Sequence, residues 1–186
     1  MAKNRLRIDN SVLLVIDVQD RLLAKIPTAT TLVQNAGFLL EVAGLLDVPM
    51  RATEQYPKGL GPTHADIRRR LPQPPAEKTA FSSCGAGTFL EELEMLARPN
   101  VVLVGMETHV CVAQTTLDLL AAGLHVYLPV DALAARSALD HDTALRRLET
   151  AGAIPTTVEA VAFEWLRDSK HPHFKAVSKL VIARMA

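Results

Sequence analysis

Cys111 is the residue of this sequence whose type and position best suit a nucleophile. It follows the apolar residues 101–104 and Gly105, and it stands just before residues 112–122, which carry a helical pattern. Free backbone N–H groups and the macrodipole at a helix N-terminus lower the pKa of a thiol, which favours the nucleophilic thiolate. The same N–H groups can stabilise an oxyanion on a carbonyl that the sulfur attacks. A single cysteine among apolar residues is more often a buried packing residue, so this interpretation requires chemical partners for Cys111.

Two charged residues are candidate partners. Asp17 ends an apolar run, residues 11–16, where a buried charge is costly unless it is paired or hydrogen-bonded. Beside a thiol, Asp17 could accept the proton as a general base, although by itself it could equally cap a nearby loop or helix. Lys78 lies in a short strand pattern, where a solvated lysine at a sheet edge is the simpler interpretation. In a shared site, Lys78 would keep Asp17 ionised and favour the thiolate electrostatically.

Strand and helix patterns alternate along the chain, which predicts an α/β fold with a parallel sheet. The expected strands are residues 11–17, 49–53, 77–81, 100–105, 124–130 and 153–157. The expected helices are residues 31–46, 65–71, 88–97, 112–122 and 140–150, with further helix on either side of 171–173. No internal repeat or long linker interrupts this pattern, so we expect a single domain over residues 1–186.

The expected strands would bring the three chemical groups together. Ligands of open α/β sheets bind beyond the carboxyl ends of the strands. Asp17 lies at one such end, Lys78 near another, and Cys111 shortly after a third. The convergence of the three at one edge is a stronger indication of a site than any of them alone.

The composition restricts the class of protein. Lysine plus arginine equals aspartate plus glutamate at 20 each, so the formal net charge is zero and favours neither nucleic acid nor an anionic membrane as a partner. The N-terminal residues lack an apolar signal core, and the two cysteines, Cys84 and Cys111, are too few for a disulfide framework. We therefore expect a cytoplasmic protein with both thiols reduced. Low net charge also makes a homo-oligomer plausible.

Three segments resemble the isochorismatase-like hydrolases. They are the nucleophile segment GMETHVCV at 105–112, the first-strand segment VIDVQ at 15–19, and the lysine segment EKT at 77–79. The resemblance covers about residues 13–180. It is greatest to the subgroup of isochorismatase domain-containing proteins, through TEQYPKGLG at 53–61 and HPHFK at 171–175.

The resemblance implies a fold and a set of site residues. The family fold is a doubly wound, three-layer α/β/α arrangement with a six-stranded parallel sheet, usually assembled into dimers or larger oligomers. Its catalytic Asp–Lys–Cys triad corresponds here to Asp17, Lys78 and Cys111. The family also has a cis peptide bond, corresponding to Met106–Glu107, and the backbone amides of Glu107 and Cys111 would form the oxyanion hole.

Two departures from the family pattern narrow the expected activity. Nicotinamidases of this superfamily bind a metal through Asp-x-His and a second histidine, but residues 53–55 read Thr-Glu-Gln, so we expect no metal. Isochorismatases proper lack the nucleophilic cysteine, so Cys111 favours acyl chemistry. An incomplete glycine motif at residues 85–87 also gives no reason to expect a nucleotide cofactor, and we expect none.

These observations predict a metal-independent cysteine hydrolase that acts on a small amide-like substrate through a thioester. Gln55, Tyr56 and Phe81 are the expected pocket wall, because their loops follow neighbouring strand ends. The alternative is an interaction or scaffold protein that retains the fold and the triad without useful turnover.

Overall fold

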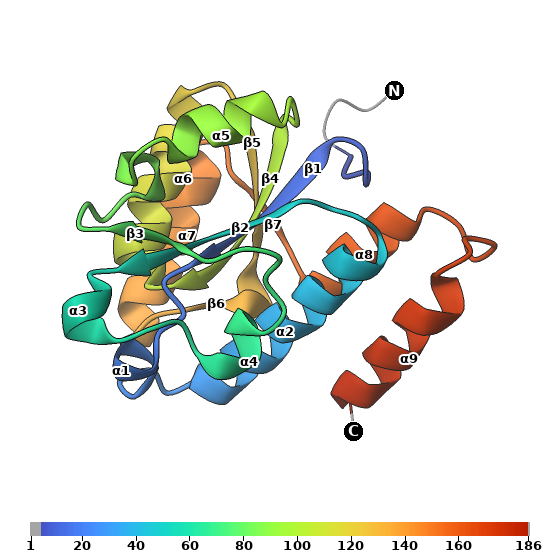
Figure 1. The fold of residues 1–186 in the computed structure, drawn as a ribbon, viewed down its shortest axis with the longest axis horizontal. Coiled ribbons are helices and arrows are strands. Elements are labelled where there is room, and N and C mark those ends of the chain that lie inside the picture. Colours follow the sequence, from blue (N-terminus) through green and yellow to red (C-terminus); the bar gives the residue numbers. More distant parts are fainter. Residues whose placement is uncertain (1–4, 186) are drawn as a thin grey trace.

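A parallel β-sheet forms the centre of the computed structural model, which describes residues 5–185 (Figure 1). The strands are β1 Ser11–Ile16, β2 Met50–Gln55, β3 Ala76–Lys78, β4 Asn100–Met106, β5 His125–Pro129, β6 Leu133–Ala134 and β7 Ile154–Thr156. Their order is β3-β2-β1-β4-β5-β7, with the two-residue β6 paired to the end of β4. The main path therefore contains the six strands that were expected, and the predicted α/β/α class is confirmed.

Helices cover both faces of the sheet. The α-helices are α1 Asp20–Leu23, α2 Ala29–Leu45, α3 Pro57–Leu60, α4 Ala65–Arg68, α5 Phe89–Met95, α6 Ala113–Ala121, α7 Ala138–Thr150, α8 Val158–Leu166 and α9 Phe174–Met185. Single turns of other helix types are η1 Ser83–Gly85, η2 Thr108–Val112 and η3 Val130–Ala132. One core cluster packs α2, α8 and α9 against the sheet, and a second packs α5, α6 and α7 against the opposite face.

The two central strands are apolar because both of their faces are covered. All residues of β1 and β4 are buried, and the two strands pair in parallel from Ser11 opposite Asn100 to Ile16 opposite Gly105. This register places the ends of both strands at the same edge of the sheet. That edge lies towards α1, α3 and β6 at the lower left of Figure 1.

Gly105 allows β4 to approach β1 closely at this edge. Its φ is +130°, and a Cβ atom built there would stand 2.1 Å from the carbonyl oxygen of Ile16. Only glycine fits such a position, since any side chain would collide with the neighbouring backbone. The end of β4 is thereby held against the residue that precedes Asp17.

Several boundaries differ from those expected. β3 ends at Lys78 rather than at residue 81, because the chain turns so that the carbonyls of Ala80 and Phe81 meet the Lys78 side chain. Residues 54–62, which lie between an expected strand and an expected helix, contain the end of β2 and the short helix α3, and α1 was not expected. No helix within residues 5–185 is both long and apolar enough to cross a membrane.

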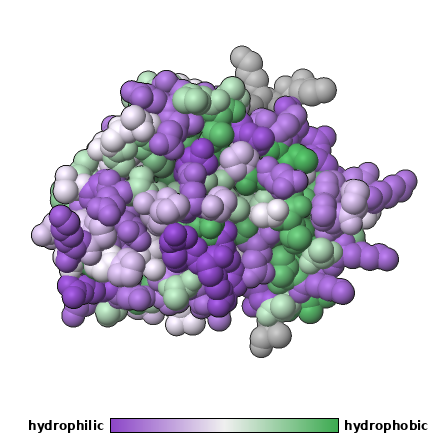
Figure 2. Space-filling view, viewed as in Figure 1, coloured by the Kyte–Doolittle hydropathy of each residue, from purple (hydrophilic) through white to green (hydrophobic). Residues whose placement is uncertain are grey.

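The exposed surface is mixed in character. Figure 2 shows hydrophilic residues over most of this face, with apolar residues gathered towards the side where α8 and α9 lie. The partly buried apolar residues Phe174, Leu180 and Val181 of α9 pack against the larger core cluster.

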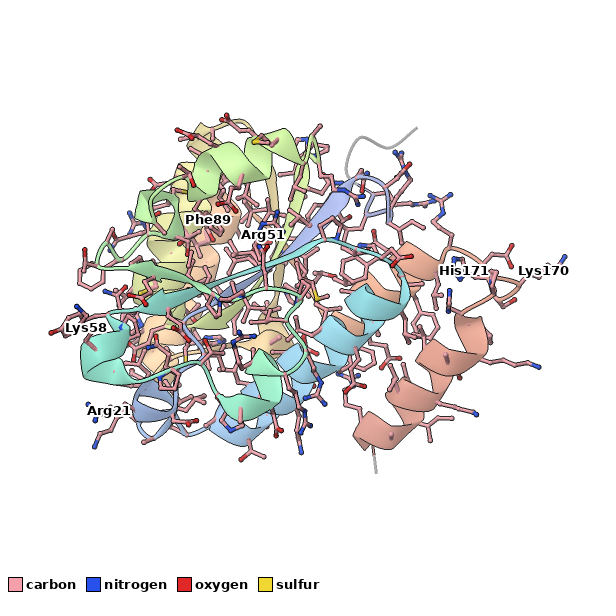
Figure 3. The ribbon with its side chains drawn as sticks, in the orientation of Figure 1. Arg21, Arg51, Lys58, Phe89, Lys170 and His171 are labelled. Atoms are coloured by element: carbon pink, nitrogen blue, oxygen red, sulfur yellow. The ribbon has the colours of Figure 1, made fainter. Side chains whose placement is uncertain are left out.

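The turn between α8 and α9, with Lys170 and His171, projects from the opposite side of the molecule to Lys58 (Figure 3). The HPHFK segment therefore lies far from the strand ends that carry the predicted triad.

Candidate active site

Asp17 and Lys78 form an ion pair at the carboxyl edge of the sheet. The Lys78 Nζ lies 2.6 Å from Asp17 Oδ2, and neither side chain is exposed. Asp17 follows β1 directly and has a φ of +52°, a conformation that is rare for residues other than glycine. Such a backbone conformation is characteristic of functional sites, where the surrounding structure imposes it.

Thr53 fixes the second oxygen of the Asp17 carboxylate. The Thr53 hydroxyl donates a hydrogen bond of 2.8 Å to Asp17 Oδ1, and the Asp17 N–H donates one of 3.1 Å to the Thr53 carbonyl. Thr53 is on β2, opposite Ile16 of β1. The neighbouring strand therefore determines the orientation of the carboxylate.

The Lys78 ammonium is surrounded by acceptors. Besides Asp17 it donates to Gln55 Oε1 at 2.7 Å, to the carbonyl of Phe81 at 2.9 Å and, more weakly, to that of Ala80 at 3.3 Å. An ammonium has three N–H donors, so these contacts use all of them. Lys78 is thus held in place with no free donor for a further strong hydrogen bond.

Cys111 lies within the π-helical turn η2, just before α6, and is 7% exposed. The charges of Asp17 and Lys78 both act on the pKa of its thiol, in opposite directions. The structure therefore brings together Asp17, Lys78 and Cys111, which the sequence placed at three separate strand ends.

The predicted lowering of the Cys111 pKa is wrong. Burial, followed by the negative charge of Asp17, raises the pKa of the Cys111 thiol to about 12, although Lys78 acts in the opposite direction. Burial also raises the pKa of Asp17, against the opposing effects of Lys78 and Thr53. The thiol is therefore neutral at rest, and it lies beside a carboxylate whose basicity is increased.

A chain of buried hydroxyl groups joins Asp17 to the backbone of Cys111. Because the Thr53 hydroxyl donates to Asp17, the Ser83 hydroxyl, 3.2 Å away, donates to Thr53. The Ser83 N–H donates to Thr115 Oγ1 at 2.9 Å, and Thr115 Oγ1 donates to the Cys111 carbonyl at 2.6 Å. Ser83 is thus connected both to the carboxylate and to the cysteine turn.

These three hydroxyl residues were not equally recognisable from the sequence. Thr53 could have been suspected, because it ends an expected strand beside that of Asp17. Ser83 and Thr115 have no comparable signal, since their roles depend on how η1 and α6 pack against each other. Side-chain hydrogen bonds between distant segments have no sequence periodicity that would reveal them.

The peptide bond between Met106 and Glu107 is cis. Glu107 also forms an ion pair with Arg136, with Oε1 2.6 Å from Nε. Thr108, in the same turn as Cys111, has its Oγ1 2.9 Å from His141 Nδ1, within hydrogen-bond distance. Burial lowers the pKa of His141, with Asp142 opposing the shift.

The three expected wall residues occupy different environments. The Gln55 amide is engaged within the protein, because it accepts from Lys78 and donates to the Thr79 carbonyl at 2.9 Å. Tyr56 and Phe81 are each 53% exposed. Of the three, only Tyr56 lines the nearby cavity of about 370 Å³, whose other lining residues are Pro57, Lys58, Glu77, Lys78, Thr79 and Gly85. Lys58 marks α3 at the left of Figure 3, on the side of this cavity.

Two further features concern thiols and metals. Cys84 is partly buried in η1, and burial raises the pKa of its thiol. Among residues 5–185, no group of three or more His, Cys, Asp or Glu side chains is arranged to hold a metal ion.

Comparison with known proteins assigns the chain to a family. The family model described as Isochorismatase domain matches residues 11–160. Isochorismatase domain-containing protein 2 of Homo sapiens is 40% identical over 175 residues, which are 92% of this chain and 83% of the human protein. Isochorismatase domain-containing protein 2A of Mus musculus is 38% identical over 174 residues, 93% of this chain and 83% of the mouse protein.

Two solved structures are similar to this chain in overall fold. The MAR1 ribonuclease of Caenorhabditis elegans is 41% identical, with a TM-score of 0.91, and the match covers 96% of this chain and 93% of that one. The YcaC gene product of Escherichia coli, described as an octameric hydrolase of unknown specificity, is 22% identical with a TM-score of 0.86, covering 98% of this chain and 97% of that one. At that identity the second likeness concerns the fold alone.

Proposed function

Because this chain belongs to the isochorismatase family, we propose that it is a cysteine hydrolase whose substrate is a small amide-like molecule. The observation that carries the proposal is the buried Asp17–Lys78 ion pair beside the Cys111 thiol. Two charges are costly to bury even as a pair, and groups with perturbed pKa values cluster at functional sites.

In the proposed reaction, Asp17 accepts the thiol proton as the Cys111 sulfur attacks the substrate carbonyl. A C–S bond forms, and the carbonyl π electrons move to the oxygen, which the backbone amides of Glu107 and Cys111 stabilise. The tetrahedral intermediate then collapses: the C–N bond breaks, and the proton on Asp17 passes to the leaving nitrogen. Water hydrolyses the thioester with Asp17 again as base, so amide and water give acid and amine.

Lys78 assists this reaction by holding Asp17. Its charge opposes the rise in the pKa of Asp17 that burial causes, so the carboxylate is available as a base. Its other donors are taken by Gln55 and the carbonyl of Phe81. We therefore assign Lys78 to the positioning and ionisation of Asp17 rather than to contact with the substrate.

RNA is a second candidate substrate, because the C. elegans relative is named a ribonuclease. Two observations favour the small amide. Lys78 has no free donor to bind a phosphate, and the chain has 20 basic and 20 acidic residues, which give no excess positive charge to attract a polyanion. A protein with the same site but without turnover is the third candidate.

Trapping of an acyl-enzyme tests the proposal. The protein is incubated with a panel of small amides and activated esters, quenched in acid, and analysed by intact and peptide mass spectrometry. We expect the mass of the acyl group on Cys111 in the wild type, none in Cys111→Ala, and unchanged labelling in the control Cys84→Ala.

The same preparation is assayed for cleavage of a labelled single-stranded RNA. RNA cleavage that survives Cys111→Ala, without acylation of Cys111 by any amide or ester, would contradict the hydrolase proposal. Absence of both activities would favour the non-catalytic alternative.

A further inference from the structure

Two cavities lie on opposite sides of the triad along the carboxyl edge of the sheet. The first is the cavity of about 370 Å³ that includes Lys78, at the end of β3. The second, of about 260 Å³, is lined by β6, by the start of α2 and by His141 of α7. The strand order β3-β2-β1-β4, with β6 beside the end of β4, places Asp17 between them.

The second cavity adjoins the turn that carries the nucleophile. Ala134, in its wall, pairs with Met106, the first residue of the cis peptide bond. His141, also in the wall, lies 2.9 Å from Thr108 Oγ1, and Thr108 belongs to the same turn as Cys111. Ala134 and His141 are thus the wall residues that separate this cavity from the turn of Cys111, and the cavity lies on the β6 side of that turn.

The lining of the second cavity is suited to an uncharged group. Leu32, Leu133, Ala134 and Ala135 form an apolar floor in which no residue is more than 8% exposed. The one carboxylate in the wall, Asp131, is engaged elsewhere: Oδ1 accepts from the Val158 N–H at 2.9 Å, and Oδ2 lies 3.5 Å from Arg184 Nη1. No unpaired charge of this wall would favour a charged ligand.

The first cavity has the opposite character. Its walls include the charged residues Lys58, Glu77 and Lys78. In the proposed reaction the proton on Asp17 passes to the leaving amine, and the partner of Asp17 on that side is Lys78. The polar cavity therefore suits the leaving amine, whereas the apolar cavity suits the group that stays bound to Cys111 as a thioester.

We infer that the 260 Å³ cavity binds the acyl group of the substrate. The substrate is then an amide whose acyl group carries no charge and consists of a short alkyl chain or a single ring. The volume is slightly below the range of about 300–1,000 Å³ that accommodates drug-sized ligands. A cavity of roughly 150 Å³ already accepts benzene, so one substituted ring fits. This inference rests on the proposed function for the identity of the ligand as substrate.

Binding to the variant Cys111→Ser tests the inference without requiring turnover. Benzamide and acetamide are titrated at constant pH, and the imidazole signals of His141 are followed by NMR. We expect benzamide to bind at least about tenfold more tightly than acetamide, since one buried methylene alone gives about 10-fold or more in such pockets. We also expect benzamide to shift the His141 signals.

Two neighbouring substitutions on α7 provide the matched control. Ala138→Trp blocks the cavity from its exposed rim, whereas Leu139→Trp changes a residue that is 73% exposed and does not line it. We expect Ala138→Trp, in the Cys111→Ser background, to weaken benzamide binding about tenfold or more and Leu139→Trp to leave it unchanged. Equal binding in the two variants, or benzamide binding without a shift at His141, would overturn the inference. Benzamide binding at His141 in a protein whose Cys111 is never acylated would retain the cavity as a binding site and count against the hydrolase proposal alone.

Discussion

The ammonium of Lys78 lies 2.6 Å from the carboxylate of Asp17, and both side chains are completely buried. Desolvation of two charges costs several kcal/mol per ion, and their attraction compensates only while both are present. The pair therefore stabilises the fold only as a unit, and it holds the proposed general base next to Cys111.

Removal of one partner should be much more damaging than removal of both. Lys78→Met leaves the Asp17 carboxylate buried and unpaired, so we expect a loss of about 3–5 kcal/mol in the free energy of unfolding. The double variant Asp17→Asn, Lys78→Met should recover most of that loss. Urea unfolding of the wild type, both single variants and the double variant measures this cycle. A loss of less than about 1 kcal/mol in Lys78→Met, as for an exposed pair, would show that the two charges are not buried together.

Gly105 should tolerate no side chain. In Gly105→Ala the new Cβ would stand 2.1 Å from the Ile16 carbonyl oxygen, so the strands must separate beside Asp17. We expect a loss of about 4 kcal/mol or more, the range of the most damaging single substitutions. Gly123→Ala is the control: its φ is +83°, but no atom lies within 4 Å of the added Cβ, so it should cost only about 1–2 kcal/mol. Thermal unfolding compares the two, and similar midpoints would contradict the close approach of β4 to β1.

Thr115 and Thr116 offer a second matched pair. Thr115 Oγ1 bonds the Ser83 N–H and the Cys111 carbonyl, whereas Thr116 Oγ1 is buried and has no hydrogen-bond partner within the described residues 5–185. Thr115→Val should therefore cost about 1–3 kcal/mol and slow acylation of Cys111, and Thr116→Val should be neutral or stabilising. Thr115→Ser, which keeps the hydroxyl, should restore the reactivity of Cys111. If both valine variants behave alike, the hydroxyl chain does not position the nucleophile.

The pH dependence of stability should include a contribution from His141. Burial lowers the pKa of His141 in the folded protein, so the unfolded chain binds more protons below about pH 6.5. The contribution of His141 to the free energy of unfolding is therefore fully present above that pH, and it is lost as the pH falls through the pKa of His141 in the folded protein. His141→Asn should reduce this loss. Urea unfolding at several pH values compares the slopes, and equal slopes for the wild type and His141→Asn would contradict the assignment.

The sequence predicted the framework well because burial on both faces leaves a clear pattern. The apolar runs of β1 and β4 were identified with small errors in boundaries, with Asp17 after β1 and Gly105 near the end of β4. The short elements α1, α3 and β6 were missed, since four residues or fewer carry no periodicity.

The electrostatics of the site could not be predicted from position along the chain. A helix N-terminus suggested a lowered pKa for Cys111, but burial and the adjacent Asp17 have the larger effect and raise it. Similarly, Lys78 looked like a solvated edge residue, because the acceptors from Gln55, Ala80 and Phe81 meet it only in the fold. Both outcomes depend on contacts between distant segments.

The central claim is that Asp17 acts as a general base on a neutral Cys111 thiol. The most direct test is the pH dependence of acrylamide addition to Cys111 and Cys84, measured separately by peptide mass spectrometry, in the wild type and in Asp17→Asn. A thiol that reacts only as free thiolate gains about tenfold in rate per pH unit below its pKa, and Cys84 should behave in this way.

Cys111 should instead react at a nearly constant rate between about pH 7 and pH 9, since its proton is removed within the site by ionised Asp17. No thiolate should be visible by ultraviolet absorbance at rest, and Asp17→Asn should slow Cys111 and make its rate rise with pH as that of Cys84 does. A wild-type rate at Cys111 that rises tenfold per pH unit, or one unchanged by Asp17→Asn, would contradict the account.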